Sequence, residues 1–175
     1  MAKLYKLLVT GTFNAGKTTF VNTLSDIDTV NTDRITHRKD EVKVKKTTTV
    51  ALDYGTLKIN GSVNIHLFGT PGQERFDFMR DLLADGMHGF IFLVDSTDKS
   101  SLRNATELLT LFKKRRNVPY LLAANKADQC GLSSAEIRHL LKLPQQQPVV
   151  PCIATDKKST RVVVEQLVAM IEAGH

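Results

Sequence analysis

The chain has 175 residues, of which 42% are hydrophobic, so it can bury one ordinary core and leaves no room for a second domain. It contains no signal peptide, no internal repeat and no apolar run of about twenty residues that would span a bilayer. The two cysteines, Cys130 and Cys152, form no evident disulfide framework, so we expect reduced thiols and a cytoplasmic location.

The first predicted unit is a strand, a loop and a helix. Leu4–Thr10 is a short apolar run typical of a buried strand, and Lys17–Ser25 is expected to be helical. Between them the sequence GTFNAGKT, residues 11–18, fits the phosphate-binding pattern G-x-x-x-x-G-K-T in the strand-to-helix context that it needs. The predicted nucleotide contacts from this P-loop are Gly11, Asn14, Ala15, Gly16, Lys17, Thr18 and Thr19.

The physical reason for this prediction lies in the loop's backbone and two side chains. Gly11 and Gly16 let the main chain curl so that N–H groups point at a phosphate from a helix N-terminus. Lys17 is expected to reach the β- and γ-phosphate oxygens, and the Thr18 hydroxyl to bind Mg²⁺. The alternative is a glycine-containing surface turn.

The segment of residues 26–48 is polar and charged, with almost no apolar periodicity. A long stretch of this kind inside a compact domain is usually functional or disordered. After it, strands are expected at Val50–Ile59 and Val63–Phe68. They are joined by Asn60-Gly61, which is typical of a type I′ hairpin, so this pair should be antiparallel.

Strands and helices alternate over the rest of the chain. Further strands are predicted at Gly89–Asp95, Tyr120–Asn125 and Val149–Ile153, and further helices at Glu74–Asp85, Ser100–Arg116, Ser133–Lys142 and Thr160–Ala173. This alternation predicts an α/β fold with a six-stranded, mainly parallel sheet, one antiparallel strand and helices on both faces. The ligand motifs then fall at the same edge of the sheet.

The second ligand motif, N-K-x-D at Asn125–Asp128, directly follows a predicted strand. The Asp128 carboxylate can accept hydrogen bonds from guanine N1–H and the 2-amino group, whereas adenine has an acceptor at N1 and no group at C2. A site built on such bonds rejects the wrong base on the order of 10⁴-fold or more. A solvated turn is the alternative for the tetrapeptide alone. Together with the P-loop, it predicts GTP binding through Asn125, Lys126 and Asp128.

Five blocks in order then resemble the Ras-like small GTPase family, and its Rab-like and bacterial or archaeal members most closely. They are the P-loop, TVALDYG at 49–55, GTPGQERF at 69–76, NKAD at 125–128 and CIAT at 152–155. The resemblance covers nearly the whole chain. It implies the P-loop NTPase fold, a single G domain of residues 1–175, GTP or GDP as ligand, and Mg²⁺.

The resemblance also assigns roles to residues outside the P-loop. It places a second Mg²⁺ ligand on Thr49, the γ-phosphate-sensing glycine on Gly72 and the water-positioning glutamine on Gln73, and it directs the Ala154 N–H to guanine O6. With Lys17, Gln73 and Thr49 make up the expected catalytic set. Loss of the γ-phosphate would release the segments around Thr49 and Gly72, which gives a switch that protein effectors read.

Two positions depart from the family pattern. Gly69 stands where the resemblance implies an aspartate that helps to hold Mg²⁺, which predicts weaker metal dependence or a replacement carboxylate, with Asp53 and Asp95 as candidates. Phe13 stands where many members have glycine, and its bulk predicts a clash with an arginine finger inserted by a partner. Without a finger, turnover should fall below ~1 s⁻¹.

The function predicted from the sequence is a cytoplasmic GTP-binding switch with slow hydrolysis, which acts through protein effectors, an exchange factor and a GTPase-activating partner. A homodimer that supplies an arginine in trans stays open. The main alternative is a scaffold that holds GTP or GDP without hydrolysis, which Gly69 and Phe13 favour and Gln73 and Thr49 oppose. An ATP-dependent kinase on the same fold is a third, and it would require a lid and an acceptor site.

The net charge of +6 does not by itself indicate a nucleic-acid or membrane partner. The basic run Lys113–Arg116 closes a predicted helix, where cations complement the helix dipole. No lipid anchor is expected, because residue 2 is alanine and Glu172–His175 contains no prenylatable cysteine.

Overall fold

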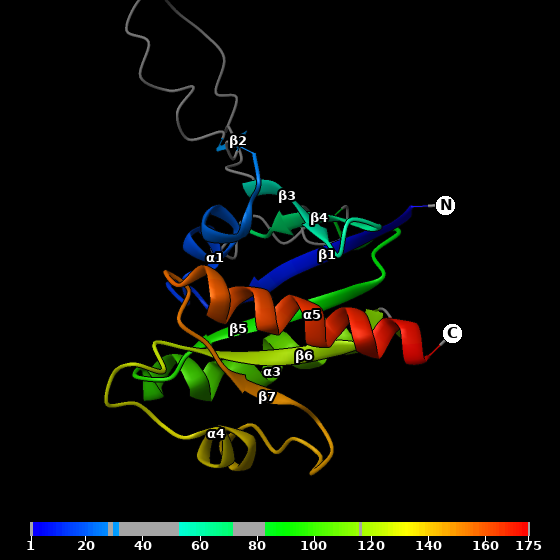
Figure 1. The fold of residues 1–175 in the computed structure, drawn as a ribbon. Helices are drawn as coiled ribbons and strands as arrows, with labels where there is room; N and C mark the ends of the chain where they lie inside the picture. Colours follow the sequence, from blue (N-terminus) through cyan, green and yellow to red (C-terminus); the bar gives the residue numbers. More distant parts are fainter. Residues whose placement is uncertain (1, 28–29, 32–52, 72–82, 116, 175) are drawn as a thin grey trace, which may run out of the picture.

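The computed structural model describes residues 2–27, 30–31, 53–71, 83–115 and 117–174 (Figure 1). Its seven-stranded sheet has the order β2-β3-β4-β1-β5-β6-β7. The strands are β1 (Lys3–Gly11), β2 (Val30–Asn31), β3 (Asp53–Ile59), β4 (Val63–Gly69), β5 (Gly89–Asp95), β6 (Tyr120–Asn125) and β7 (Val149–Pro151). The helices are α1 (Lys17–Leu24), α3 (Lys99–Arg115), α4 (Ser134–Leu140) and α5 (Lys157–Ala173).

The predicted α/β P-loop NTPase fold is confirmed. β1 pairs in parallel with β4 and β5, and β6 continues the parallel sheet to β7, whereas β3 pairs antiparallel with β4. All six predicted strands are present. The two-residue β2 adds an antiparallel edge that was not predicted, because two residues carry no periodic signal.

Of the helix predicted at Glu74–Asp85, the described residues Leu83 and Ala84 are helical, and the segment 72–82 lies outside the described residues, as do Val50–Leu52.

The core lies on both faces of the sheet, because successive side chains of a central strand point in opposite directions. Leu7 of β1 belongs to one buried cluster with side chains of α1 and α5, whereas Leu8 belongs to a second cluster with side chains of α3 and α4. Figure 1 shows α1 and α5 in front of the sheet and α3 behind it. This arrangement confirms the prediction of helices on both faces and leaves the strand ends free to carry loops.

The β3–β4 hairpin has the expected turn chemistry. Asn60 and Gly61 both have positive φ, 50° and 70°, as a type I′ turn requires. The Ser62 N–H donates to Ile59 O at 3.3 Å, and the register pairs Ile59 with Val63. At the other end of the hairpin, this register sets Asp53 directly opposite Gly69.

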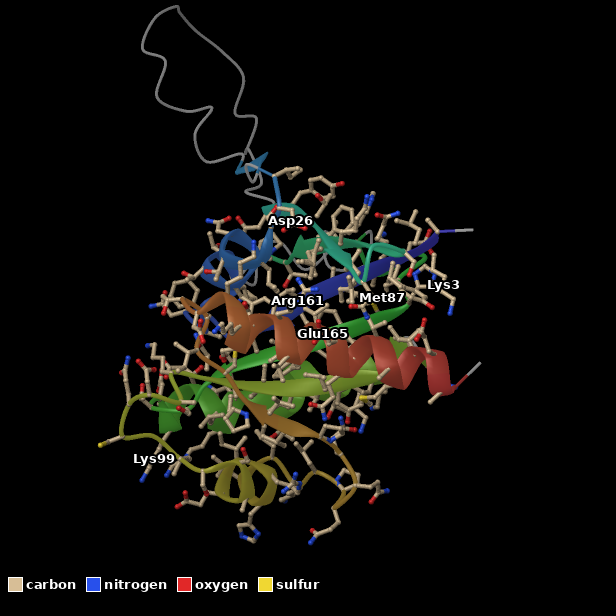
Figure 2. All side chains as sticks on the ribbon, in the orientation of Figure 1. Lys3, Asp26, Met87, Lys99, Arg161 and Glu165 are labelled. Atoms are coloured by element: carbon tan, nitrogen blue, oxygen red, sulfur yellow. The ribbon has the colours of Figure 1, made fainter. Side chains whose placement is uncertain are left out.

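The segment after α1 runs along the outer side of β3. Thr56 donates its N–H to Ser25 Oγ at 3.2 Å, and its carbonyl accepts the Asp26 N–H at 2.7 Å. Asp26, labelled in Figure 2, accepts the Lys58 N–H at 3.0 Å, which is the main reason that the pKa of its carboxyl lies below the ordinary value. An ion pair at 3.3 Å joins the same carboxyl to Lys157 at the start of α5.

Among the described residues, no helix combines the length and apolar character needed to cross a membrane. Cys130 is exposed and Cys152 is buried, and both are free thiols. Burial raises the pKa of the Cys152 thiol to about 11, so it is protonated and unreactive near neutral pH.

Candidate nucleotide-binding site

The P-loop connects β1 to α1 through two glycines that no other residue can replace without strain. Gly11 has φ +139°, and a Cβ at this position would lie 1.9 Å from the carbonyl oxygen of Leu93. Gly16 has φ +98° and sits at the N-cap of α1 without a side-chain cap. The first turn of α1 also carries no acidic residue. Its N-terminal amides are therefore oriented toward the loop, where an anion would bind them.

The other predicted P-loop contacts differ in exposure. Ala15 is buried, Thr18 and Thr19 are exposed, and Asn14 adopts a left-handed conformation with φ 60°. Phe13 is 62% exposed and stands out from the loop. Its ring therefore lies at the surface and does not fill the core.

The Lys17 ammonium lies inside the loop. It is buried together with its stem and donates to the carbonyl oxygens of Gly11 at 3.3 Å and Thr12 at 2.6 Å. A phosphate oxygen offers a stronger partner for an ammonium than a neutral carbonyl does, because the bond is then charge-assisted on both sides. The position of Lys17 thus fits its predicted role as the phosphate-binding lysine.

A metal-compatible pair of oxygens lies beside the loop. Thr18 Oγ1 donates to Asp53 Oδ2 at 2.6 Å, and Asp53 is buried at 8% exposure. Hydroxyl and carboxylate oxygens suit Mg²⁺, which in nucleotide sites takes one or two protein ligands and completes its shell with phosphates and water. In the described part of the chain, no group of three or more His, Cys, Asp or Glu side chains could hold a metal by itself. We call the P-loop together with Asp53 and Gly69 the phosphate side of the site.

Asp95, the other candidate carboxylate, lies elsewhere. It forms an ion pair with the Lys126 ammonium and accepts the Thr97 hydroxyl at 2.6 Å and the Thr97 N–H at 2.9 Å. Burial opposes ionisation of Asp95, but the hydrogen bonds from Lys126 and Thr97 outweigh it, so the pKa of its carboxyl lies below the ordinary value. Asp95 therefore supports the N-K-x-D segment, and Asp53 is the carboxylate at the phosphate side.

Asn125 connects the P-loop to the loop after β7. Its Nδ2 donates to Ala15 O at 2.8 Å, and its Oδ1 accepts the Ala154 N–H at 2.8 Å, with 4% of the residue exposed. A Cβ on Gly16 would lie 2.5 Å from Asn125 Nδ2, so glycine at this position makes room for the bridge. The sequence predicts that Asn125 contacts the nucleotide but does not show this bridging role, because Asn125 lies 110 residues from Ala15 in the chain.

The remaining base-contact candidates surround Asn125. Asp128 is exposed, and its carboxylate has no hydrogen-bond or ion-pair partner among the described residues. Lys126 has φ 62° and is held by Asp95. The Ala154 N–H, predicted to face guanine O6, donates to Asn125 here, so a contact with O6 would have to share this proton. We call Asp95, Asn125, Lys126, Asp128 and Ala154 the base side of the site.

Three predicted site residues, Thr49, Gly72 and Gln73, lie outside the described residues. Their roles in binding the metal, sensing the γ-phosphate and positioning water therefore stay predictions. The described residues bring together the phosphate-binding and base-binding parts of the predicted site, at the carboxyl ends of β1, β4 and β6 and the amino end of the antiparallel strand β3.

A protein-family model described as "Conserved hypothetical ATP binding protein" matches residues 26–173. The chain belongs to this family. An uncharacterised protein of Methanocaldococcus jannaschii is 33% identical over 132 residues, which cover 75% of this chain and 76% of that protein.

Two groups of small-GTPase relatives match as well. ADP-ribosylation factor-related protein 1 of Homo sapiens is 33% identical over 127 residues, 71% of this chain and 60% of that protein. The GTP-binding protein YPTM1 of Zea mays is 27% identical over 175 residues, 97% of this chain and 77% of that protein. These relatives confirm that the chain is related to the Ras-like small GTPases.

The family match leaves the choice of base open. It begins after the P-loop, and its description names ATP, whereas the name of the maize relative states GTP binding. The matched region also spans only 60% of ADP-ribosylation factor-related protein 1, so that relative has sequence outside the alignment.

Proposed function

We propose that this chain is a GTP-binding molecular switch that hydrolyses GTP slowly to GDP and phosphate in the cytoplasm. The observation that carries the proposal is the Asn125 bridge between Ala15 of the P-loop and Ala154. This bridge connects the phosphate side to the base side at one edge of the sheet, which supports binding of a single ligand that contacts both.

The base proposed for the site is guanine. Asp128 is exposed next to this bridge, and a carboxylate there accepts both N1–H and the 2-amino group of guanine. Adenine would leave the same carboxylate facing an acceptor, which is unfavourable by several kcal/mol. The ATP in the family description is the competing assignment, and it requires Asp128 to have no part in base recognition.

For hydrolysis, we assign one role to each predicted catalytic residue. Gln73 orients a water for in-line attack on the γ-phosphorus, and the bond to the β–γ bridging oxygen breaks as the new P–O bond forms. Lys17 and the P-loop amides stabilise the charge that develops on the phosphate oxygens. Thr18 and Thr49 would hold Mg²⁺, which neutralises phosphate charge when bound.

The predicted partners are protein effectors that recognise the triphosphate state, an exchange factor and a GTPase-activating partner. The exposed ring of Phe13 beside the P-loop obstructs an inserted arginine, which supports slow unassisted turnover. The same feature, with Gly69, supports the alternative of a scaffold that binds GTP or GDP without hydrolysis.

The first experiment is single-turnover hydrolysis of bound [γ-³²P]GTP with and without Mg²⁺, with [γ-³²P]ATP as control. We expect slow, Mg²⁺-dependent phosphate release from GTP that Gln73→Ala abolishes and the exposed Gln166→Ala leaves unchanged. GTP that is bound but intact after many hours would favour the scaffold. Turnover of ATP but not GTP would support the family description and overturn the proposal.

Base recognition is tested separately with Asp128→Asn. The amide of asparagine presents an N–H donor, which suits the C2 carbonyl of xanthine better than the amino group of guanine. We expect GTP affinity to fall at least about 100-fold and xanthosine triphosphate to gain affinity relative to GTP. Glu107→Gln, an exposed charge removal on α3, serves as control, and unchanged GTP affinity in Asp128→Asn would contradict guanine recognition.

A further inference from the structure

Position 69 has no side chain, and the structure shows that one would meet Asp53. A Cβ built on Gly69 lies 2.9 Å from Asp53 Cβ and 3.1 Å from Asp53 Oδ2. Contacts below 3.0 Å between such atoms require the backbone or the neighbour to shift. The antiparallel register sets the two residues directly opposite each other, so their side chains share one face of the sheet.

The Asp53 carboxylate therefore lies where a side chain from position 69 would begin. It is buried, and it holds the Thr18 hydroxyl at 2.6 Å, the group expected to bind Mg²⁺. A buried carboxylate is costly unless it is hydrogen-bonded or bound to a cation. Asp95, the alternative carboxylate, is engaged by Lys126 and Thr97 at the base side.

We propose that Asp53 supplies, from β3, the metal-site carboxylate that position 69 on β4 lacks. Asp53 is then a positioning residue that orients Thr18 and the water shell of a divalent cation beside the P-loop. This inference rests on the nucleotide-and-Mg²⁺ binding part of the proposed function and does not depend on hydrolysis. Its consequence is that cation occupancy is coupled to β3, the strand that follows Thr49 in the sequence by only a few residues.

The test measures dissociation of fluorescent mant-GDP from the full chain across a Mg²⁺ titration that starts in EDTA. In the wild type, Mg²⁺ should slow dissociation with a defined midpoint. Asp53→Asn keeps the size of the side chain and an oxygen for Thr18 but removes the charge. We expect it to raise the Mg²⁺ midpoint by about 10–100-fold, as loss of an outer-shell ligand does.

A carboxylate swap provides the second, independent variant. Asp53→Gly removes the obstruction, and Asp53→Gly/Gly69→Asp returns the carboxylate to the opposite strand. We expect the double variant to have a Mg²⁺ midpoint closer to wild type than Asp53→Gly alone. Gly69→Asp by itself should lower the melting temperature, because two carboxylates then compete for one position.

The outcomes separate the inference from the proposed function. Glu107→Gln, an exposed charge removal on α3, should leave the midpoint unchanged. A wild-type midpoint in Asp53→Asn, or a double variant no better than Asp53→Gly, overturns the role of Asp53 while nucleotide binding stands. A wild-type chain that retains no guanine nucleotide at any Mg²⁺ concentration overturns both.

Discussion

The base side and the phosphate side of the site are organised in different ways. On the base side, Asn125 uses both polar atoms of its amide on fixed main-chain groups, and Asp95 holds Lys126. On the phosphate side, Lys17 donates to carbonyl oxygens of its own loop, and Thr18 donates to Asp53. The first set of contacts can persist with ligand bound, whereas the second set occupies groups that a phosphate or a cation would need.

This difference distinguishes contacts that stabilise the fold from contacts that are replaced when a ligand binds. A bond that persists through binding contributes to the stability of the fold in both states and pre-organises the site. A hydrogen bond that the ligand must replace stabilises only the ligand-free state. Its loss on binding reduces the net free energy gained from the ligand's own contacts. We therefore expect removal of the Asn125 hydrogen bonds on the base side to lower both stability and affinity, and removal of the Lys17 ammonium on the phosphate side to lower affinity alone.

The largest effect is expected from Asn125→Ala. It leaves Ala15 O and the Ala154 N–H without a partner in a buried setting, at about 1–3 kcal/mol each. The ligand-free melting temperature should fall by about 5–15 °C for a domain of this size. Differential scanning calorimetry of the apo protein measures it, with the exposed Asn104→Ala on α3 as control. An unchanged melting temperature would show that the Asn125 hydrogen bonds do not stabilise the fold.

A binding effect without loss of stability is expected from Lys17→Met. Removal of the ammonium deletes the charge-assisted contact to phosphate, so GTP affinity should fall about 100-fold or more. The apo melting temperature should stay the same or rise, because a buried charge is replaced by an apolar side chain of similar length. Isothermal titration calorimetry measures the GTP affinity of Lys17→Met and scanning calorimetry its apo melting temperature, with the exposed Lys114→Met as control. A fall in both the affinity and the melting temperature would contradict the difference between the two sides.

The smallest effect concerns pH and sharpens the description of the base side. The pKa of Asp95 is lowered in the fold, so its contribution to stability is present above the ordinary carboxyl pKa of about 3.9 and is lost as pH falls through the folded value. Asp95→Asn should therefore cost about 1 kcal/mol or less near pH 7. Urea unfolding should show this difference shrinking below about pH 4, and a difference constant with pH would contradict the role of the charge.

Much of the fold and the ligand motifs could be predicted from the sequence, because local patterns determine them. The apolar runs of β5 and β6 and the turn at Asn60-Gly61 each lie within a few residues, and all three were found. The Asn125 bridge depends on Ala15, which lies 110 residues from Asn125, so no local pattern contains it. The two-residue β2 depends on pairing with β3 and has no signal of its own.

The sequence alone does not determine which carboxylate lies at the metal site. Asp53 and Asp95 were equal candidates until the hairpin register separated them. The observed connection pairs Ile59 with Val63 and hence Asp53 with Gly69. A connection shorter by one residue would pair Asp53 with Phe68 and would turn its carboxylate to the other face relative to β4. The length of the turn at Asn60-Gly61, which lies outside both ligand motifs, therefore decides which residue faces Gly69, and no pattern around Asp53 reveals it.

The covering of β3 has a consequence for self-association. The N–H and carbonyl of Thr56 and the N–H of Lys58 are bound by Ser25 and Asp26, so these three main-chain groups are not open to a second sheet. At the opposite end, β7 has only three residues and finishes at Pro151, which has no N–H to donate. Short, covered and proline-terminated borders oppose the growth of one sheet into the next. The described borders therefore oppose strand-by-strand aggregation of the molecule.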